Sequence, residues 1–406
     1  MRKEPTHWEY IKETSQYNES DYRSRFYKGK WEKAWLKDVF TYATRGDIPL
    51  YEAMWLRCGD KLEHMPKRLF KFFPFNHNSL KCIETNAVFV NSPKNFNDPF
   101  DSLLCANENE FLKKCLIEHI KKTGAVGRGI LSSEELIKLE NSCCVEKSIY
   151  GNIYKTFDSV VLHLCYDANK NEMKRGASEI NDVLFDAEMK YRSTLEKLRE
   201  SSVRISSFAD INEFKLTSYM ELWAHYAQNH EGFCVEYDLA EALENQKENA
   251  MVSGGLLPCS YGTGQILLSK QKIYKYANGL PLTSHEKMEL DKSIMLSFLM
   301  KSSSWRYENE WRLILPLDIC KIYNNMIPFF RMKAFYIGCR MPRDNKEYLY
   351  RIAQRKNITV YNMEMHEHRF ELEGDYNPVD IGKYFKEKND KMDRLCQSKY
   401  DFTLLS

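Results

Sequence analysis

Residues 301–316 carry the stretch from which the fold is predicted, K-S-S-S-W-R-Y-E-N-E-W-R-L-I-L-P. This pattern is typical of the end of a helix, a short polar turn and then a strand that begins near Glu308. Because successive side chains of a strand point to opposite faces, Glu308 and Glu310 are expected on the same side. The other side would be held in a core by apolar residues, namely Trp311, Leu313 and Leu315.

The two neighbouring acids allow two interpretations. Two carboxylates on one face repel and desolvate each other, which is unfavourable without a cation, a proton or a substrate. A functional interpretation therefore places them in a binding cleft. A structural interpretation makes the segment an edge strand with a solvated acidic face that Arg306 and Arg312 balance. This stretch alone does not decide between the two.

The composition is that of an ordinary folded protein. A chain of 406 residues can form one elaborated domain or several smaller ones. Hydrophobic residues at 43% and charged residues at 29% argue against disorder, and a net charge of +2 gives no general argument for nucleic acid or membrane. We find no apolar run that could span a bilayer and no signal peptide, so we expect a cytoplasmic protein without a membrane partner.

The cysteines do not have metal-site spacing. Twelve of them are scattered along the chain, no C-x-x-C pair occurs, and Cys143 and Cys144 are adjacent, which is poor geometry for a mutual disulfide. We interpret them as free and mostly buried thiols in a reducing compartment, and we expect no structural zinc.

The pattern of apolar residues predicts an α+β fold. Short strands are expected at 69–75, 87–91, 203–208, 233–238, 259–261, 334–338 and 358–363, forming a mixed, mostly antiparallel core. The core domain would comprise 67–102 and 202–372. Helices are expected in the three remaining parts, which are an N-terminal region (1–66), an insertion (103–201) and a C-terminal tail (373–406).

The N-terminal region alternates basic and aromatic residues, and two interpretations stay open. It could follow a nucleic-acid backbone, or it could be an amphipathic helix with a lysine-rich outer face. The basic residues are Arg23, Arg25, Lys28, Lys30, Lys33 and Lys37, and the aromatic ones are Phe26, Tyr27, Trp31 and Trp35.

A helix is expected at 219–229, ending at Gly232 as a left-handed helix stop. Glu221 and His225 are four residues apart and share one face of this helix, a spacing that can bind a metal. A histidine bonded to a carboxylate inside a core explains the same residues, and no third ligand stands at a recognisable spacing. We therefore expect no metal cofactor.

Five motifs, taken together and in order, resemble a bacterial family catalogued as domain of unknown function 2971. The resemblance covers roughly residues 67–345 and by itself implies no activity. The motifs are N-F-N-D-P-F-D (95–101), S-S-F (206–208), L-W-A-H-Y-A-Q-N-H-E-G-F-C-V-E-Y-D (222–238), W-R-Y-E-N-E-W-R-L-I (305–314) and F-Y-I-G (335–338).

A second resemblance suggests chemistry. The chain is similar in order to ADP-ribosyltransferases with an Arg-Ser-Glu arrangement, which carry a basic residue on the first core strand, then a Ser, then Glu/Gln-x-Glu before a late strand. The matching positions are Arg68 or Lys71, then Ser206 and Ser207, then Glu308 and Glu310. Lys71 stands where those enzymes usually show Arg or His.

This resemblance implies an enzyme that uses NAD as a substrate. Cleavage of the nicotinamide–ribose bond passes through an oxocarbenium-like state, which a fixed carboxylate stabilises. The resemblance makes Glu310 that carboxylate, and Glu308 the group that orients or deprotonates the acceptor. The remaining roles are support of Glu310 and the ribose by Ser206 and Ser207, and contact of Arg68 or Lys71 with the pyrophosphate. Aromatic residues such as Tyr226, Tyr261 and Trp305 would stack on nicotinamide, and His225 is expected to contact the cofactor as well.

The implied acceptor is a protein or a nucleic acid, in a toxin or anti-phage defence system where a partner restrains the activity. Two other functions stay open. One is a metal-dependent nuclease that uses Asp98, Asp101, Glu221 and His225. The basic, aromatic N-terminal region would then bind the nucleic acid. The other is a non-catalytic binding module of a defence system.

Overall fold

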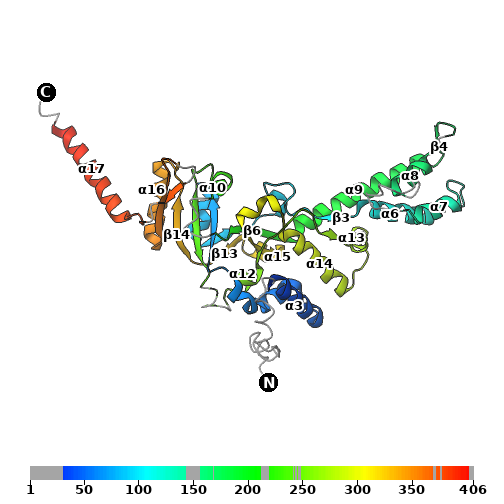
Figure 1. The fold of residues 1–406 in the computed structure, drawn as a ribbon, viewed down its shortest axis with the longest axis horizontal. Helices are drawn as coiled ribbons and strands as arrows, with labels where there is room; N and C mark the ends of the chain where they lie inside the picture. The colour runs from blue at the N-terminus through cyan, green and yellow to red at the C-terminus, as the bar shows by residue number, and fades with distance from the viewer. Residues whose placement is uncertain are drawn as a thin grey trace, which may run out of the picture.

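A single mixed sheet organises the protein, described here from a computed structural model (Figure 1). Its eight strands lie in the order β16-β15-β14-β7-β1-β6-β12-β8, and every neighbouring pair is antiparallel except β14 and β15. This confirms the expected α+β fold with a mostly antiparallel core. The structure describes residues 31–142, 156–167, 169–211, 219–240, 242, 245, 248–368, 372–374 and 377–401.

Most predicted strands are found in this sheet, while those expected at 87–91 and 259–261 lie in small two-stranded pairs. The sheet strands are β1 (Arg68–Phe73), β6 (Val203–Ala209), β7 (Phe233–Asp238), β8 (Leu256–Pro258), β12 (Glu310–Pro316), β14 (Met332–Ile337), β15 (Thr359–Met365) and β16 (Leu372–Gly374). The short pairs are β2 (Ala87–Phe89) with β13 (Met326–Pro328), β3 (Cys105–Ala106) with β10 (Leu267–Leu268), β4 (Tyr166–Asp167) with β5 (Glu172–Met173), and β9 (Ser260–Gly262) with β11 (Met300–Ser302).

The helices surround the sheet and extend from it. Before β6 they are α3 (Trp31–Gly46), α4 (Leu50–Leu56), α5 (His77–Thr85), α6 (Glu108–Thr123), α7 (Ser133–Glu140), α8 (Phe157–Cys165) and α9 (Ala177–Ser201). After it they are α10 (Met220–Tyr226), α12 (Ala250–Gly255), α13 (Lys270–Ala277), α14 (Ser284–Leu299), α15 (Leu317–Ile322), α16 (Arg343–Lys356) and α17 (Ile381–Asp401). Short 3-10 helices are η1 (Cys58–His64), η2 (Pro93–Asn95) and η5 (Ser303–Glu308).

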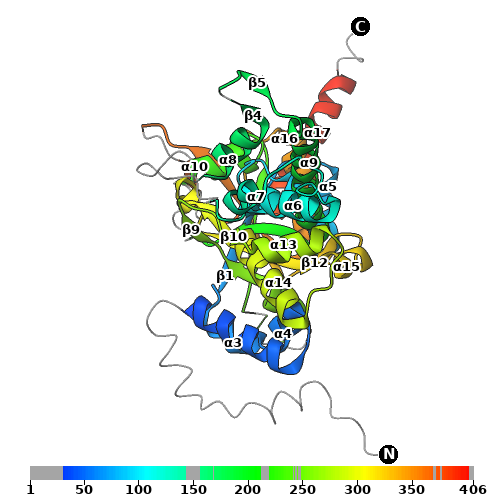
Figure 2. The same ribbon diagram turned by 90° about the vertical axis from the view of Figure 1, so that its right-hand side faces the viewer.

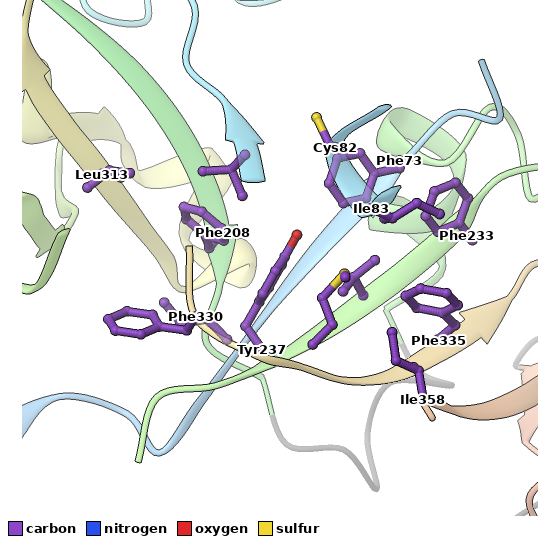
Figure 3. Close-up of a cluster of buried hydrophobic side chains, with 14 of the residues drawn as sticks. Phe73, Cys82, Ile83, Phe208, Phe233, Tyr237, Leu313, Phe330, Phe335 and Ile358 are labelled. Carbon is purple, nitrogen blue, oxygen red and sulfur yellow. The ribbon is translucent and has the colours of Figure 1, made fainter. Parts of the chain in front are cut away.

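Alternation along each strand separates two hydrophobic layers. On β12, Trp311, Leu313 and Leu315 join the largest buried cluster, as predicted, whereas Ile314 joins a second cluster on the opposite face. Figure 3 shows part of the first cluster, where rings from β1, β6, β7 and β14 pack with Cys82 and Ile83 of α5. The strand is therefore held firmly on both faces.

The sheet is not equally well paired throughout. β1 pairs with β7 along its whole length, from Arg68↔Asp238 to Phe73↔Phe233, but meets β6 only at Phe70↔Ala209. β6 in turn pairs with β12 over all seven of its residues. The sheet thus has two continuous parts that join at one narrow seam between β1 and β6.

The segment 103–201, expected as a helical insertion, forms α6 to α9 and extends away from the sheet (Figures 1 and 2). Its outer part has a buried cluster of its own, which includes Leu116, Leu139 and Leu164. Near the sheet, Phe111 and Tyr191 join the second cluster together with residues of α14. The inserted helices therefore have a hydrophobic core of their own, and near the sheet they also pack into the second cluster.

In the N-terminal region, described from Trp31 onward, the tryptophans serve packing. Trp35 is fully buried, its indole N–H donates to the carbonyl of Arg57, and the Lys61 ammonium lies 4.4 Å from its ring centre. Trp31 stacks on His64 and Trp311. This arrangement matches the amphipathic-helix interpretation for α3. The basic residues expected to grip nucleic acid before Trp31 (Arg23, Arg25, Lys28 and Lys30) lie outside the described residues.

The prediction that Gly232 ends the helix as a left-handed residue is wrong. Helix α10 ends earlier, at Tyr226, and the left-handed residues are Gln228, Asn229 and His230. Gly232 does not have a positive φ. It is required because a Cβ there would lie 2.1 Å from the carbonyl oxygen of Phe73, closer than any real contact.

The cysteines whose side chains the structure describes, including Cys58 and Cys234, are free thiols, as predicted, whereas Cys143 and Cys144 lie outside the described residues. None of the described helices is both long enough and apolar enough to cross a membrane.

Candidate active site

A cleft of about 540 Å³ opens at the seam between β1 and β6. Its walls come from β1, β6, α10, the loop that follows β2, and the segment that leads into β12. The lining residues are Phe70, Lys71, Phe72, Pro74, Asn91, Asn95, Phe96, Asn97, Asp101, Ser207, Phe208, Ala209, Leu222, His225, Tyr226, Lys301, Glu308 and Glu310.

The two acids of the opening stretch lie in this cleft, but a turn brings them together rather than an extended strand. Glu308 is the last residue of η5, Asn309 is left-handed (φ 43°, ψ 54°), and Glu310 is the first residue of β12. Both acids are 4% exposed, and β12 lies between β6 and β8. The interpretation as an edge strand with a solvated acidic face is therefore wrong.

Lys301 relieves the repulsion between these acids. Its ammonium lies 2.5 Å from Oε2 of Glu308 and 2.6 Å from Oε2 of Glu310, and its side chain is only 5% exposed. Burial alone would lower the pKa of Lys301, but the two carboxylates outweigh this effect and raise it. The sequence argument asked for a cation, a proton or a substrate beside the acids and did not identify Lys301, although this residue begins the stretch.

Arg312 holds Glu310 from behind. Its Nε donates to Oε1 of Glu310 at 2.8 Å, and its Nη2 donates to Oδ2 of Asp101 at 2.6 Å. The Nη1 group donates to the carbonyl of Phe298 and to the hydroxyl of Ser102. Arg312 therefore balances Glu310, as the structural interpretation supposed, but it does so with a fully buried side chain.

These five residues, Asp101, Lys301, Glu308, Glu310 and Arg312, are called the ion cluster below. With all groups ionised, three carboxylates face two cations, which leaves one net negative charge. Burying such a charge is costly unless it is paired or holds a proton. The cluster therefore has a reason to bind either a proton or a positively charged ligand.

The pKa values of the two glutamates shift in opposite directions. Burial raises the pKa of Glu308, and Lys301 only partly opposes this. Burial also acts to raise the pKa of Glu310, but Arg312 and Lys301 outweigh it and lower the pKa. Glu310 is thus a permanent anion, while Glu308 is the acid of the pair that more readily exchanges a proton.

Tyr226 and His225 bring α10 into the site. The Tyr226 hydroxyl donates to Oε1 of Glu308 at 2.8 Å, so Glu308 has a partner on each oxygen. His225 packs edge-on against Trp305, with ring centres 5.8 Å apart. Both residues line the cleft, as the resemblance to ADP-ribosyltransferases implied for a ligand-binding role.

Lys71 is a second cation in the lining of the cleft. Its ammonium donates to the carbonyl of Ser207 at 2.9 Å and lies 5.0 Å from the ring centre of Phe208. Burial lowers the pKa of Lys71 to about 8, so the amine stays mostly protonated at neutral pH. Arg68, the other candidate, does not line the cleft. It lies at the start of β1, 3.3 Å from Glu236.

Ser206 and Ser207, expected to act together, point to opposite faces of β6. Ser207 pairs with Arg312 in the ladder and lines the cleft. Ser206 pairs with Leu313, is buried, and does not line the cleft. Adjacent residues of a strand cannot share a face, so only Ser207 can touch a ligand there.

Two further predicted ligand residues support the site from outside. The Tyr261 hydroxyl accepts a hydrogen bond of 2.7 Å from the Glu310 backbone N–H. The Trp305 indole N–H donates to Oδ2 of Asp98 at 2.8 Å, and the Lys301 ammonium lies 5.1 Å from its ring centre. Neither residue belongs to the lining of the cleft, so both are better described as positioning residues.

Two of the residues proposed for a metal-dependent nuclease, Asp98 and Asp101, have other partners. Asp101 is paired with Arg312, and Asp98 accepts bonds from Trp305 and from the Phe100 backbone. Within the described residues no group of three or more His, Cys, Asp or Glu side chains is placed to hold a metal ion. The structure therefore offers no observation that favours this alternative.

Sequence comparison relates part of the chain to a known family. Residues 222–313 match the model of a family described as protein of unknown function (DUF2971), which includes α10, Glu308 and Glu310. No curated protein and no solved structure matches the chain.

Proposed function

We propose that this chain, which belongs through residues 222–313 to the family of proteins of unknown function DUF2971, is an NAD-dependent ADP-ribosyltransferase-like enzyme. The observation that carries the proposal is the convergence of Lys71, Ser207 and the Glu308–Glu310 pair on one cleft. They come from, or lead into, β1, β6 and β12, strands distant in sequence that are consecutive neighbours in the sheet. This is the order of basic residue, serine and acids on which the resemblance rests.

The charges in the cleft suit cleavage of a nicotinamide–ribose bond. As this bond breaks, its electron pair leaves with nicotinamide and positive charge develops on the ribose. Glu310 supplies a preorganised negative charge that costs no reorganisation, because Arg312 and Lys301 keep it ionised. The acceptor then bonds to the ribose carbon and gives its proton to Glu308.

The two glutamates therefore have different tasks in this proposal. Both oxygens of Glu310 accept bonds from Arg312 or Lys301, so it acts mainly through its charge. Glu308 is held by Lys301 and Tyr226 but has a raised pKa, which suits a group that takes up a proton. Lys71 would contact the pyrophosphate, and Tyr226 or His225 would stack on nicotinamide.

The acceptor, a protein or a nucleic acid, follows from the resemblance alone. The same holds for a toxin or anti-phage role and for a restraining partner, whereas the proposal of a cytoplasmic location comes from the sequence itself.

The test is incubation of the folded protein with labelled NAD, cell lysate and RNA, followed by measurement of nicotinamide release and of label transfer. Glu308→Gln should reduce release at least about 100-fold, the usual size of an acid–base contribution. The matched control is Glu364→Gln, a substitution of an exposed glutamate on β15, which should keep full activity. Absence of both nicotinamide release and label transfer with folded wild-type protein would reject the proposal.

A further inference from the structure

Lys61, Lys71 and Lys301 each have a buried or half-buried side chain, but their surroundings differ. Lys61 donates to two neutral carbonyls and does not line the cleft. Lys301 lines the cleft, but its ammonium is held between the carboxylates of Glu308 and Glu310. Lys71 combines the two properties that the others have separately, because it lines the cleft and has a neutral carbonyl as its acceptor.

The ammonium of Lys71 is surrounded by a neutral acceptor and by aromatic rings. It donates to the carbonyl of Ser207 at 2.9 Å, and it lies 5.0 Å from the ring centre of Phe208 and 5.6 Å from that of Phe73. Among the described residues, no carboxylate oxygen lies within 4.0 Å of this ammonium. A desolvated lysine without a close counter-ion releases its proton more easily than an ion-paired one, so its amine is more available as a nucleophile.

Burial and nearby groups act on this amine in opposite directions. Burial lowers the pKa of Lys71 from 10.5 to about 8, although Cys82 of α5 and Glu310 of β12 both act to raise it. Both oxygens of Glu310 are already engaged by Arg312 and Lys301. At pH 7.5 roughly a quarter of the Lys71 amine is therefore neutral, compared with about 0.1% for a lysine of pKa 10.5. The other titratable groups that line the cleft are Asp101, His225, Tyr226, Lys301 and Glu308.

The cleft around Lys71 suits a small ligand with a flat body. Phe70, Phe72 and Phe96 line it together with Tyr226, and aromatic rings pack well against flat molecules. Its volume of about 540 Å³ lies within the range of small-molecule sites. An available amine in such a place can react with a carbonyl carbon, as lysines that form Schiff bases do.

We infer that Lys71 is a nucleophilic lysine that captures a small aldehyde in the cleft as an imine. The nitrogen of the neutral amine bonds to the carbonyl carbon, and the π bond of the carbonyl breaks. The two protons of the amine leave with the oxygen as water, so the step needs no oxidant or reductant. The ligand class is an aldehyde with a flat, mainly apolar body. The inference does not depend on the proposed function, although both use the same cleft.

The experiment treats the full-length protein with pyridine-3-carboxaldehyde and cyanoborohydride at pH 7.5, and peptide mass spectrometry then measures the labelling rate of each lysine. The hydride reduces the imine to a stable secondary amine. Lys71 should be labelled at least about tenfold faster than Lys321, which is 65% exposed, because the larger neutral fraction outweighs the restricted access. Lys61 and Lys301 should be labelled more slowly than Lys321. Labelling of Lys71 no faster than Lys321, or fastest labelling at Lys61 or Lys301, would overturn the inference.

Two controls assign the reactivity to the folded site. In concentrated guanidinium the preference for Lys71 over Lys321 should fall below about threefold, because the unfolded chain gives both amines similar surroundings. Lys71→Arg should remove the fast phase of label uptake by the whole protein, whereas Lys321→Arg should keep it. A preference that survives unfolding, or a fast phase that survives in folded Lys71→Arg, would contradict the assignment. If Lys71→Arg does not fold, the labelling rates of the unmodified protein still decide the inference.

The outcomes also separate this inference from the transferase proposal. Selective labelling of Lys71 in a protein that does not cleave NAD would keep the reactive lysine and reject the transferase. Release of nicotinamide from NAD without selective labelling of Lys71 would do the reverse.

Discussion

At the scale of single residues, the cleft shows how the same side chain acquires two different properties. Glu308 and Glu310 are both buried and both touch Lys301, but only Glu310 also touches Arg312. The extra cation lowers the pKa of Glu310, whereas burial dominates for Glu308 and raises its pKa. A permanent anion and a proton acceptor thus arise side by side from one residue type.

Loss of Lys301 should strongly destabilise the fold. Lys301→Met leaves Glu308 and Glu310 facing each other without the cation between them, and breaking a buried pair in this way costs about 3–5 kcal/mol. The measurement is the free energy of unfolding in urea. The double variant Lys301→Met/Glu308→Gln should recover part of the loss, because only one charge then remains unpaired by lysine.

The control for this prediction is Lys321→Met on α15, where the lysine side chain is 65% exposed and only loosely paired with Asp318. It should change stability by less than about 0.5 kcal/mol. Equal effects of Lys301→Met and Lys321→Met would show that the ion cluster does not stabilise the fold.

At the scale of elements, the turn between α10 and β7 holds one side of the cleft through close backbone approaches. The carbonyl of Ala227 accepts from the Gly232 N–H at 2.8 Å, and the carbonyl of Gly232 accepts from the Gly338 N–H at 2.9 Å. A Cβ on Gly232 would lie 2.1 Å from the Phe73 carbonyl oxygen. The ends of β1, β7 and β14 can meet here only because glycine has no side chain.

Gly232→Ala should therefore destabilise the protein by about 3 kcal/mol, because the new methyl group meets rigid backbone instead of a side chain that can move. Gly264→Ala is the matched control, since no atom lies within 4 Å of its Cβ position and its φ is not positive. Thermal unfolding of both variants checks this. A melting temperature of Gly232→Ala equal to that of Gly264→Ala would contradict the close approach.

At the scale of the whole molecule, one buried lysine joins the N-terminal helices to the sheet. The Lys61 ammonium, on η1, donates to the carbonyls of Gly254 and Leu256, more than 190 residues away in the chain. Its side chain is fully buried, and both of these acceptors are neutral carbonyls. Burial lowers the pKa of Lys61 from 10.5 to about 7. The contact between the N-terminal region and the core is therefore sensitive to pH.

The sign of this dependence follows from proton binding. Between about pH 7 and pH 10 the unfolded chain keeps the Lys61 proton that the folded protein releases, so the free energy of unfolding rises with pH. The rise is at most about 1.4 kcal/mol per pH unit. Urea unfolding of the wild type and of Lys61→Met at pH 7, 8 and 9 isolates this residue. The wild type should gain stability relative to the variant as pH increases, and parallel curves would contradict the prediction.

The sequence by itself determined the α+β class, the positions of β6, β7 and β14, and a strand that begins beside the acid pair at Glu308 and Glu310. Local periodicity and apolar patterning carry this information, because each strand must present one side to a core. The same alternation, applied to Ser206 and Ser207, separates them. Applied to Glu308, however, it failed, because left-handed Asn309 ends the extended backbone before that residue.

Only the tertiary structure decided how the site is assembled. The seam between β1 and β6, the bond from Tyr226 to Glu308, and the pairing of Arg312 with Asp101 all join residues that are distant in the chain. Such contacts depend on strand order and on the turn before β12, and no local pattern specifies either of them. The charge and the proton affinity of the cleft are therefore properties of the folded molecule, since burial and neighbouring ions set them.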